Sequence, residues 1–147
     1  MEGKGFGLTS DRSGRFFITR TGPGVPDVIA QVVWKDGAIV DMLPIEGEIN
    51  ASVGVVNDKG FRIMAHPAVS PDGSYILFDC NGGSHLWVTF RQADGTWSKA
   101  IDLDRHGIDK QYGIATVSRD GKYIFLSGGG DIYWVSSEGV EALRPKE

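Results

Sequence analysis

The sequence has one cysteine, no long apolar run and no excess of basic residues. Cys80 has no second cysteine to pair with, which excludes an internal disulfide framework and a zinc-ribbon pattern. No stretch approaches the roughly 18 consecutive apolar residues of a membrane-spanning helix, so we expect no membrane segment. The first ten residues, MEGKGFGLTS, lack the apolar segment of a signal peptide. We therefore expect a cytoplasmic protein, or a periplasmic or secreted one if a signal has been removed.

Basic charge and catalytic motifs are also missing. The formal net charge is −4 and charges of both signs are spread along the chain, which argues against nucleic-acid binding. The G-x-S-x-G elbow of hydrolases is absent, as is the H-E-x-x-H spacing of zinc enzymes. No window of apolar residues follows the period of an amphipathic helix. These absences favour an all-β chain without a recognisable catalytic motif.

Glycine, by contrast, is abundant, and it punctuates a phrase that the chain repeats. There are 21 glycines in 147 residues, against a usual share of ~7%. The segment SPDGSYILF at 70–78 returns as SRDGKYIFL at 118–126, and a rougher version, SDRSGRFFI, stands at 10–18. Asp-Gly pairs next to apolar runs are typical of tight turns between strands. A phrase that recurs at this spacing indicates a repeat architecture.

Each copy carries three landmarks in the same order. The first is the S-x-D-G turn, with one extra residue in the first copy. The second is a polar residue that opens an apolar strand, and the third is an acidic residue followed by glycine, a strong hairpin signal. The second and third landmarks are Asp27 and Asp36-Gly37, His85 and Asp94-Gly95, and Asp131 and Glu138-Gly139.

These landmarks divide each copy into four antiparallel strands. In the middle copy we expect strands at Ala68–Ser70, Tyr75–Cys80, His85–Phe90 and Trp97–Leu103, and in the last copy a fourth strand at Val140–Arg144. A repeated four-stranded unit of about 40–45 residues is a β-propeller blade. The predicted fold is all-β, with three blades in a single domain at 1–147. Blade 1 covers about 4–46, blade 2 about 66–103 and blade 3 about 112–145.

Two segments, HPAVSPDGSYILF and SRDGKYIFLSGGGDIYWV, resemble the TolB-type β-propeller repeat, a relative of the WD repeat. The resemblance covers nearly the whole chain and is weakest in the first copy. It implies that the chain corresponds to the C-terminal half of a six-bladed propeller. The repeated phrase is then a structural turn, and we expect its glycines, Gly73 and Gly121, to adopt positive φ.

Three blades do not close a ring, so the outer faces of blades 1 and 3 need a cover. We expect these faces to carry Phe17, Val28, Phe125, Ile132 and Trp134. Apolar patches of this kind rarely stay exposed on a monomer. The sequence therefore predicts a homodimer in which two chains close a six-bladed ring about a two-fold axis. The alternative is that the chain forms half of a longer propeller.

Candidate ligand-binding residues lie on the face that carries the connections between the second and third strands. They are His66, His85 and His106, together with Arg62 and Tyr112. Imidazole is the commonest metal ligand, and some related propeller lyases bind a metal through histidines at the channel mouth. We nevertheless predict no metal and no cofactor. We expect the imidazoles to lie far apart, each bonded to backbone or solvent, with His66 nearest the channel axis.

The predicted function is a non-enzymatic binding or interaction module with a protein or small-molecule ligand at the channel mouth. The alternative is a metal-assisted glycan lyase or hydrolase that uses the histidines at the same mouth. A third interpretation is a gene fragment that is stable only because it dimerises.

Overall fold

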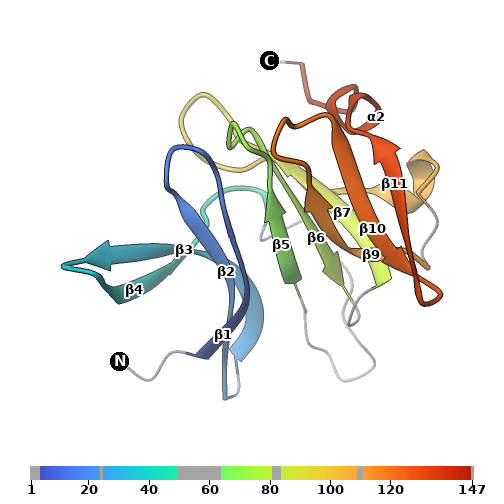
Figure 1. Ribbon diagram of the computed structural model, residues 1–147. Helices are drawn as coiled ribbons and strands as arrows, with labels where there is room; N and C mark the ends of the chain where they lie inside the picture. The colour runs from blue at the N-terminus through green and yellow to red at the C-terminus, as the bar shows by residue number, and fades with distance from the viewer. Residues whose placement is uncertain (1–3, 24, 50–63, 81–83, 109–110, 147) are drawn as a thin grey trace.

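The computed structural model describes residues 4–23, 25–49, 64–80, 84–108 and 111–146, and it contains three antiparallel sheets (Figure 1). We name these sheets blade 1, blade 2 and blade 3 in chain order. Their strand orders are β1-β2-β3-β4, β5-β6-β7-β8 and β9-β10-β11. Consecutive strands pair in each sheet, as in a propeller blade. The prediction of an all-β, propeller-like fold is therefore confirmed.

The bounds of the elements follow the chain. Blade 1 has β1 (Lys4–Ser10), β2 (Phe16–Gly22), β3 (Val25–Lys35) and β4 (Ala38–Pro44). Blade 2 has β5 (Ala65–Val69), β6 (Tyr75–Cys80), β7 (Ser84–Phe90) and β8 (Ile101–Asp102). Blade 3 has β9 (Gly113–Val117), β10 (Tyr123–Gly128) and β11 (Asp131–Ser136). The described residues also contain η1, a 3-10 helix at Leu103–His106, and α2 (Glu138–Glu141). No helix among them could span a membrane.

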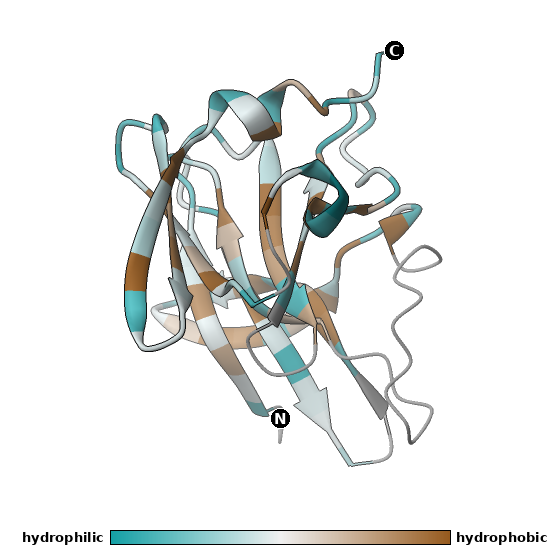
Figure 2. Cartoon of the chain, turned by 90° about the vertical axis from the view of Figure 1, so that its right-hand side faces the viewer, coloured by the Kyte–Doolittle hydropathy of each residue, from teal (hydrophilic) through white to brown (hydrophobic). Residues whose placement is uncertain are grey.

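The first strands of the three blades form the inner wall of the arc. Strand β1 contacts β5, and β5 contacts β9. The turns that follow these three strands lie together at the top of Figure 1, whereas the β10–β11 turn points to the opposite end. In Figure 2 hydrophobic residues form brown bands along the strands, and hydrophilic residues gather in the turns. The strands thus supply the core, and the turns face solvent.

The second and third copies of the repeated phrase fold into the same turn. In blade 2 the Ser70 hydroxyl donates to the Asp72 carboxylate at 2.7 Å and accepts from the backbone N–H of Tyr75 at 3.1 Å. The corresponding distances in blade 3 are 2.6 and 3.0 Å, among Ser118, Asp120 and Tyr123. Gly73 and Gly121 have φ of 71° and 79°, which confirms the predicted positive φ at both.

The first copy of the turn is one residue shorter than the others, so the extra residue predicted there is wrong. The backbone N–H of Asp11 donates to the carbonyl four residues on, at Arg15, whereas Ser70 and Ser118 donate five residues on. The Asp11 carboxylate accepts from Ser13 and Arg15. Asp11 therefore makes the hydrogen bonds that a serine and an aspartate share in the other two turns. Ser10, directly before it, is the last residue of β1.

Strand β6 is buried along its whole length because it has a neighbouring blade on each side. Its residues alternate between the two faces of the sheet. Ile76 and Phe78 pack with Phe17 of blade 1, whereas Leu77 packs with Ile124 of blade 3. The hydrophobic core therefore lies in two layers, one between blades 1 and 2 and one between blades 2 and 3.

Phe17, Leu77 and Phe125 occupy the same place in their blades, since each pairs with the second-last residue of the inner strand. Phe17 and Leu77 are buried against the following blade, so the prediction that Phe17 lies on a bare face is wrong. Val28 packs against the same core, so the prediction that it lies on a bare face is also wrong. Phe125 follows the last blade and is 39% exposed.

The outer face of blade 3 carries a group of exposed apolar side chains. Trp134 pairs with Phe125 across the sheet, and it is 64% exposed. Tyr123 packs edge-on against Trp134, with ring centroids 5.3 Å apart. Ile132, in the same strand as Trp134, is 78% exposed. The exposure predicted for blade 3 is thus confirmed.

Blade 1 covers most of its own outer face. Ile18, Ala30, Val32 and Met42 form a small buried cluster on the side away from blade 2. Phe16 packs against this cluster, and its ring lies 5.4 Å from that of Trp34, which is exposed. Fewer apolar atoms are therefore left for a partner on blade 1 than on blade 3.

Neither fourth strand predicted for the later blades forms as expected. In blade 2 the strand expected at 97–103 is regular only at Ile101–Asp102. Ser98 still donates to the Phe90 carbonyl of β7 at 2.9 Å, but the backbone N–H of Trp97 donates to the carbonyl of Glu46 at 2.9 Å. In blade 3, helix α2 replaces the strand predicted at 140–144. Val140 and Leu143 are three residues apart and both pack on the core between blades 2 and 3, a spacing that suits a helical turn.

Candidate functional site

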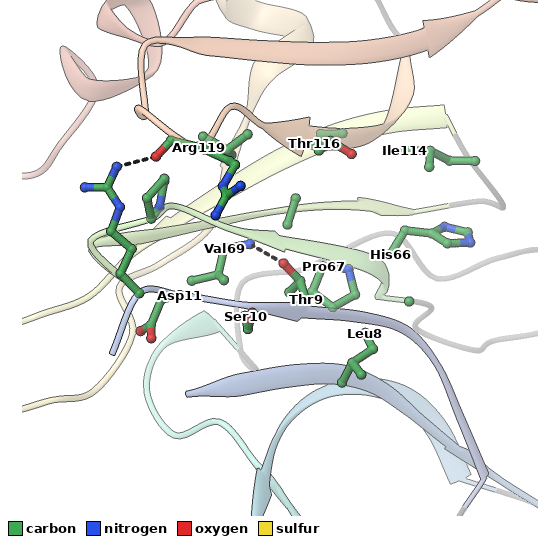
Figure 3. A pocket seen from close by; sticks show the side chains of 16 residues that line it. Leu8, Thr9, Ser10, Asp11, His66, Pro67, Val69, Ile114, Thr116 and Arg119 are labelled. Atoms are coloured by element: carbon green, nitrogen blue, oxygen red, sulfur yellow. Dashed lines mark hydrogen bonds between the residues drawn. The ribbon is translucent and has the colours of Figure 1, made fainter. Parts of the chain in front are cut away.

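A pocket of about 700 Å³ lies along the inner wall of the arc. It is lined by β1, β5 and β9 and by the turns that follow them. Figure 3 shows His66 and Ile114 at one end of this pocket and Asp11 and Arg119 at the other. The backbone N–H of Val69 donates to the Thr9 hydroxyl at 3.3 Å and ties the first two inner strands together. We call this surface the channel pocket.

Each inner strand has a bulge at the same position, where one residue adopts positive φ. The residues are Gly7 (70°), His66 (47°) and Ile114 (43°), each seven residues before a turn glycine, and all three line the channel pocket. Glycine tolerates this conformation, but in residues with a Cβ it costs about 1–2 kcal/mol. Blades 2 and 3 thus keep side chains in the pocket at positions where glycine would be unstrained.

His66 is held by a buried carboxylate. Its Nδ1 lies 2.8 Å from Oδ2 of Asp79, whose side chain is fully buried, and Phe6 packs edge-on against its ring at 5.3 Å. An ionised Asp79 can only accept, so in that state His66 donates from Nδ1–H and its Nε2 is left for a ligand. The residues that take the place of Asp79 in the other blades, Thr19 and Ser127, bear small hydroxyls. The repeat therefore does not require the His66–Asp79 pair.

The other two histidines lie elsewhere. His85 has φ of 58° and its Nδ1 lies 3.1 Å from Oδ2 of Asp104, so the expectation that the histidines bond only to backbone or solvent is wrong. His106 is in η1, beside a small apolar cavity of about 170 Å³ between η1 and α2. Of the three, His66 alone lines the channel pocket. The structure does not bring the three imidazoles together at one site.

Two further candidate residues were predicted. Tyr112 packs in the protein core, and Arg62 lies outside the described residues. The ring of Tyr112 lies 4.9 Å from that of Tyr133 and packs against the core between blades 2 and 3. A Cβ at Gly128 would overlap the Tyr112 ring, so this contact depends on the glycine.

Burial raises the pKa of the Cys80 thiol to about 12, which suits its place in the core. Within the described residues, no three His, Cys, Asp or Glu side chains form a potential metal site.

The opposite end of the channel pocket contains two arginines that sequence reasoning did not select. Arg12 and Arg119 follow the first residue of their turns, and Pro71 holds the same place in blade 2. The backbone N–H of Arg12 donates to the Pro71 carbonyl at 2.9 Å, and its guanidinium donates to the carbonyl of Arg119. Arg12 therefore links the turns of all three blades. The signal was present in the repeated phrase, but it emerges only when the turns are aligned on their structure.

Asp11, the one acidic residue among the described residues that line the channel pocket, is already paired. Its side chain is 1% exposed, and Oδ2 lies 2.6 Å from Nε of Arg15. Burial acts to raise the pKa of Asp11, but hydrogen bonds from Ser13 and Arg15 and the charge of Arg15 outweigh it and hold the pKa below its ordinary value. Asp11 is thus ionised and paired with Arg15, and no other carboxylate among the described lining residues offsets the charges of the two arginines.

The solved structures that this chain resembles include a propeller. A structure of the Dos1 propeller matches 89% of this chain at 11% identity, with a TM-score of 0.43. This chain covers 31% of that protein, so it spans less than a third of its length. No protein-family model and no curated protein matches the sequence.

Proposed function

We propose that this protein is a non-enzymatic binding module of the TolB-like propeller type, whose small-molecule ligand occupies the channel pocket. The observation that carries this proposal is the setting of His66 and Ile114 within a pocket of about 700 Å³. This volume lies in the range of about 300–1,000 Å³ that is usual for small-molecule sites. Strained side chains that line a pocket point to a role in binding, because the strain has no benefit for folding.

The proposal is specific about where the ligand binds. His66 presents Nε2, Ile114 presents apolar surface, and Thr116, between them and the arginines, is exposed and supplies a hydroxyl. Such a mixture of apolar surface with a few polar groups is typical of ligand sites. His85 and His106 lie outside this surface and have no part in the proposed site.

The test is ligand-observed and protein-observed NMR with a fragment library of carboxylates, sugars and aromatic amides. We expect fragments to shift the amide signals of Thr9, Val69 and Thr116, on the three inner strands. A His66→Ala variant should lose part of this binding, and a His106→Ala variant serves as the matched control. Binding that maps to the β10–β11 turn, or no binding by any fragment, would contradict the proposal.

We also propose that two chains associate to close a six-bladed ring, with blade 3 of one chain against blade 1 of the other. Support comes from where apolar residues are exposed. The exposed large apolar residues of the described chain lie in blades 1 and 3, and none lies in blade 2. Two identical chains bury both end faces at once, with the two-fold axis along the channel.

Sedimentation equilibrium tests the ring directly. We expect a mass of about twice the 15.9 kDa of the chain at micromolar concentration. Such a ring should bury a total area above about 2,000 Å², which is typical of obligate interfaces. Trp134→Asp should give the chain mass, because it places a charge in the proposed contact. Leu43→Asp is the control, since Leu43 is 52% exposed but lies beside blade 2. A wild-type monomer would overturn the ring, and a mass above two chains would favour a different assembly.

A further inference from the structure

Of the lysine and arginine residues that the structure describes, two line the channel pocket, Arg12 and Arg119. They stand at equivalent places in the turns of blades 1 and 3. Figure 3 shows Arg119 at the end of the pocket opposite His66, and the Arg12 guanidinium donates to the Arg119 carbonyl. Among the described residues that line the pocket, Asp11 is the one carboxylate, and it is paired with Arg15, which does not line the pocket. The described residues therefore give this mouth two positive charges without a free carboxylate beside them, on a chain whose net charge is −4.

The two guanidinium groups differ in how they are held. Arg12 is fixed by its backbone bond to Pro71 and by its side-chain bond to the Arg119 carbonyl. A guanidinium has five N–H donors, so one such bond leaves most of them for a ligand. Arg119 has no side-chain hydrogen bond or ion pair to any residue that the structure describes. One arginine is thus pre-positioned and the other is free to close on a ligand.

We propose that this mouth of the channel pocket binds an oxyanion, the carboxylate or phosphate group of a small ligand, between Arg12 and Arg119. Guanidinium groups match the planar geometry of two oxyanion oxygens better than ammonium groups do. A polyanion is disfavoured, because the acidic chain around the two arginines would repel it. The inference rests on the proposed function, since it names the chemistry of the ligand that the same pocket would hold.

The experiment uses the full chain and two probes, inorganic phosphate and succinate, each titrated against a sodium chloride series of the same ionic strength. We expect saturable shifts of the Arg12 and Arg119 Nε–Hε signals with at least one probe and none with chloride. Arg12→Gln and Arg119→Gln should each weaken binding about tenfold, because each removes charged donors. Arg91→Gln is the matched control, an exposed arginine of blade 2 outside the pocket.

The outcomes separate the two proposals. Binding of phosphate alone, or of succinate alone, supports the inference and identifies the group. Equal shifts in chloride, or binding that survives both Arg12→Gln and Arg119→Gln, would overturn it. If fragments without an acidic group bind at Thr9, Val69 and Thr116 while neither probe binds, the proposed function stands and the oxyanion inference fails. If nothing binds in the pocket, both fail.

Discussion

Blade 2 and blade 3 share a turn, three strands and nearly the same nine-residue phrase, yet their burial differs. Every residue of β6 is buried, whereas β10 alternates between buried and exposed residues. Leu77 and Phe125 hold the same place, but only Leu77 has another blade of the described chain against it. The repeat thus specifies the shape of a blade, and the neighbouring blades decide how much of it is core.

The largest expected effect concerns these two side chains. Leu77→Ala should lower the free energy of unfolding by about 2–5 kcal/mol at every protein concentration, because it leaves a cavity inside the chain. Phe125→Ala should destabilise mainly through the proposed ring, so its cost should shrink as the protein is diluted. Urea unfolding at two protein concentrations measures both. If the destabilisation by Phe125→Ala does not vary with protein concentration, Phe125 is not buried by a second chain, and the proposed ring is contradicted.

The turn glycines give the next largest difference. Gly121→Ala should cost about 1–2 kcal/mol, because alanine must adopt φ near 79° with only Pro71 nearby, at 3.8 Å. Gly73→Ala should cost more, since its Cβ would also overlap the guanidinium of Arg15 and the carboxylate of Asp11. Gly14→Ala, with φ of 82° and open space around it, is the control and should match Gly121→Ala. Thermal unfolding of the three variants ranks them, and equal costs would contradict the packing of Arg15 on blade 2.

The turns of blades 2 and 3 each hold an aspartate, Asp72 and Asp120, and these carboxyls make stability depend on pH. Burial acts to raise the pKa of Asp72, but hydrogen bonds from Ser70 and Ser74 outweigh it, and the pKa lies below the ordinary 3.8. The hydrogen bond from Ser118 lowers the pKa of Asp120 in the same way. A carboxyl with a lowered pKa in the folded state stabilises above its unfolded pKa, and this is lost as pH falls through the folded pKa.

The free energy of unfolding should therefore fall as the pH drops below about 4. In Asp72→Asn this fall should be smaller, because one of the contributing carboxyls is gone. Asp41→Asn is the control, since its side chain bonds only to the adjacent backbone N–H at Met42. Unfolding curves at pH 7, 4 and 3 measure the difference. An identical pH dependence in Asp72→Asn and wild type would be inconsistent with the lowered pKa of Asp72.

The fold was predictable from the sequence where local chemistry decides it. The residues of Ser-Pro-Asp-Gly form their turn through their own side chains and the glycine φ, so this feature is visible in the residue letters. The β6 bounds of 75–80 likewise follow from the apolar residues at 75–78 and from Cys80 at the end of the run. The fourth strands were not predictable, because Trp97 pairs with the segment after blade 1 and Val140 folds into a helix against blade 2. Those are tertiary contacts.

The candidate site was predictable only in part. His66 was selected as a histidine near an inner strand, and it does line the channel pocket. Ile114 carries no chemical signal in the sequence, and only its φ of 43° distinguishes it. Arg12 could not be matched to Arg119 from the sequence, because the first turn begins at Asp11 and is one residue shorter than the other two turns. Backbone conformation and register are set by pairing between strands, which composition does not reveal.

The smallest expected effect concerns the strained positions themselves. Ile114→Gly should leave stability unchanged or raise it by up to about 1 kcal/mol, because glycine relieves the positive φ and Ile114 is 46% exposed. Thr116→Gly, two residues along the same strand and also exposed, should instead lower it by about 0.5–1 kcal/mol, since that residue has no positive φ to relieve.

Melting temperatures of both variants, with fragment binding as a second readout, complete this test. The proposed function requires that Ile114→Gly weakens fragment binding in the channel pocket while it keeps or improves stability. A variant that is both less stable and unchanged in binding would show that Ile114 serves the fold. If it is more stable and binds less, blade 3 keeps a strained isoleucine for its ligand, as blade 2 keeps His66 at the same place in its own inner strand.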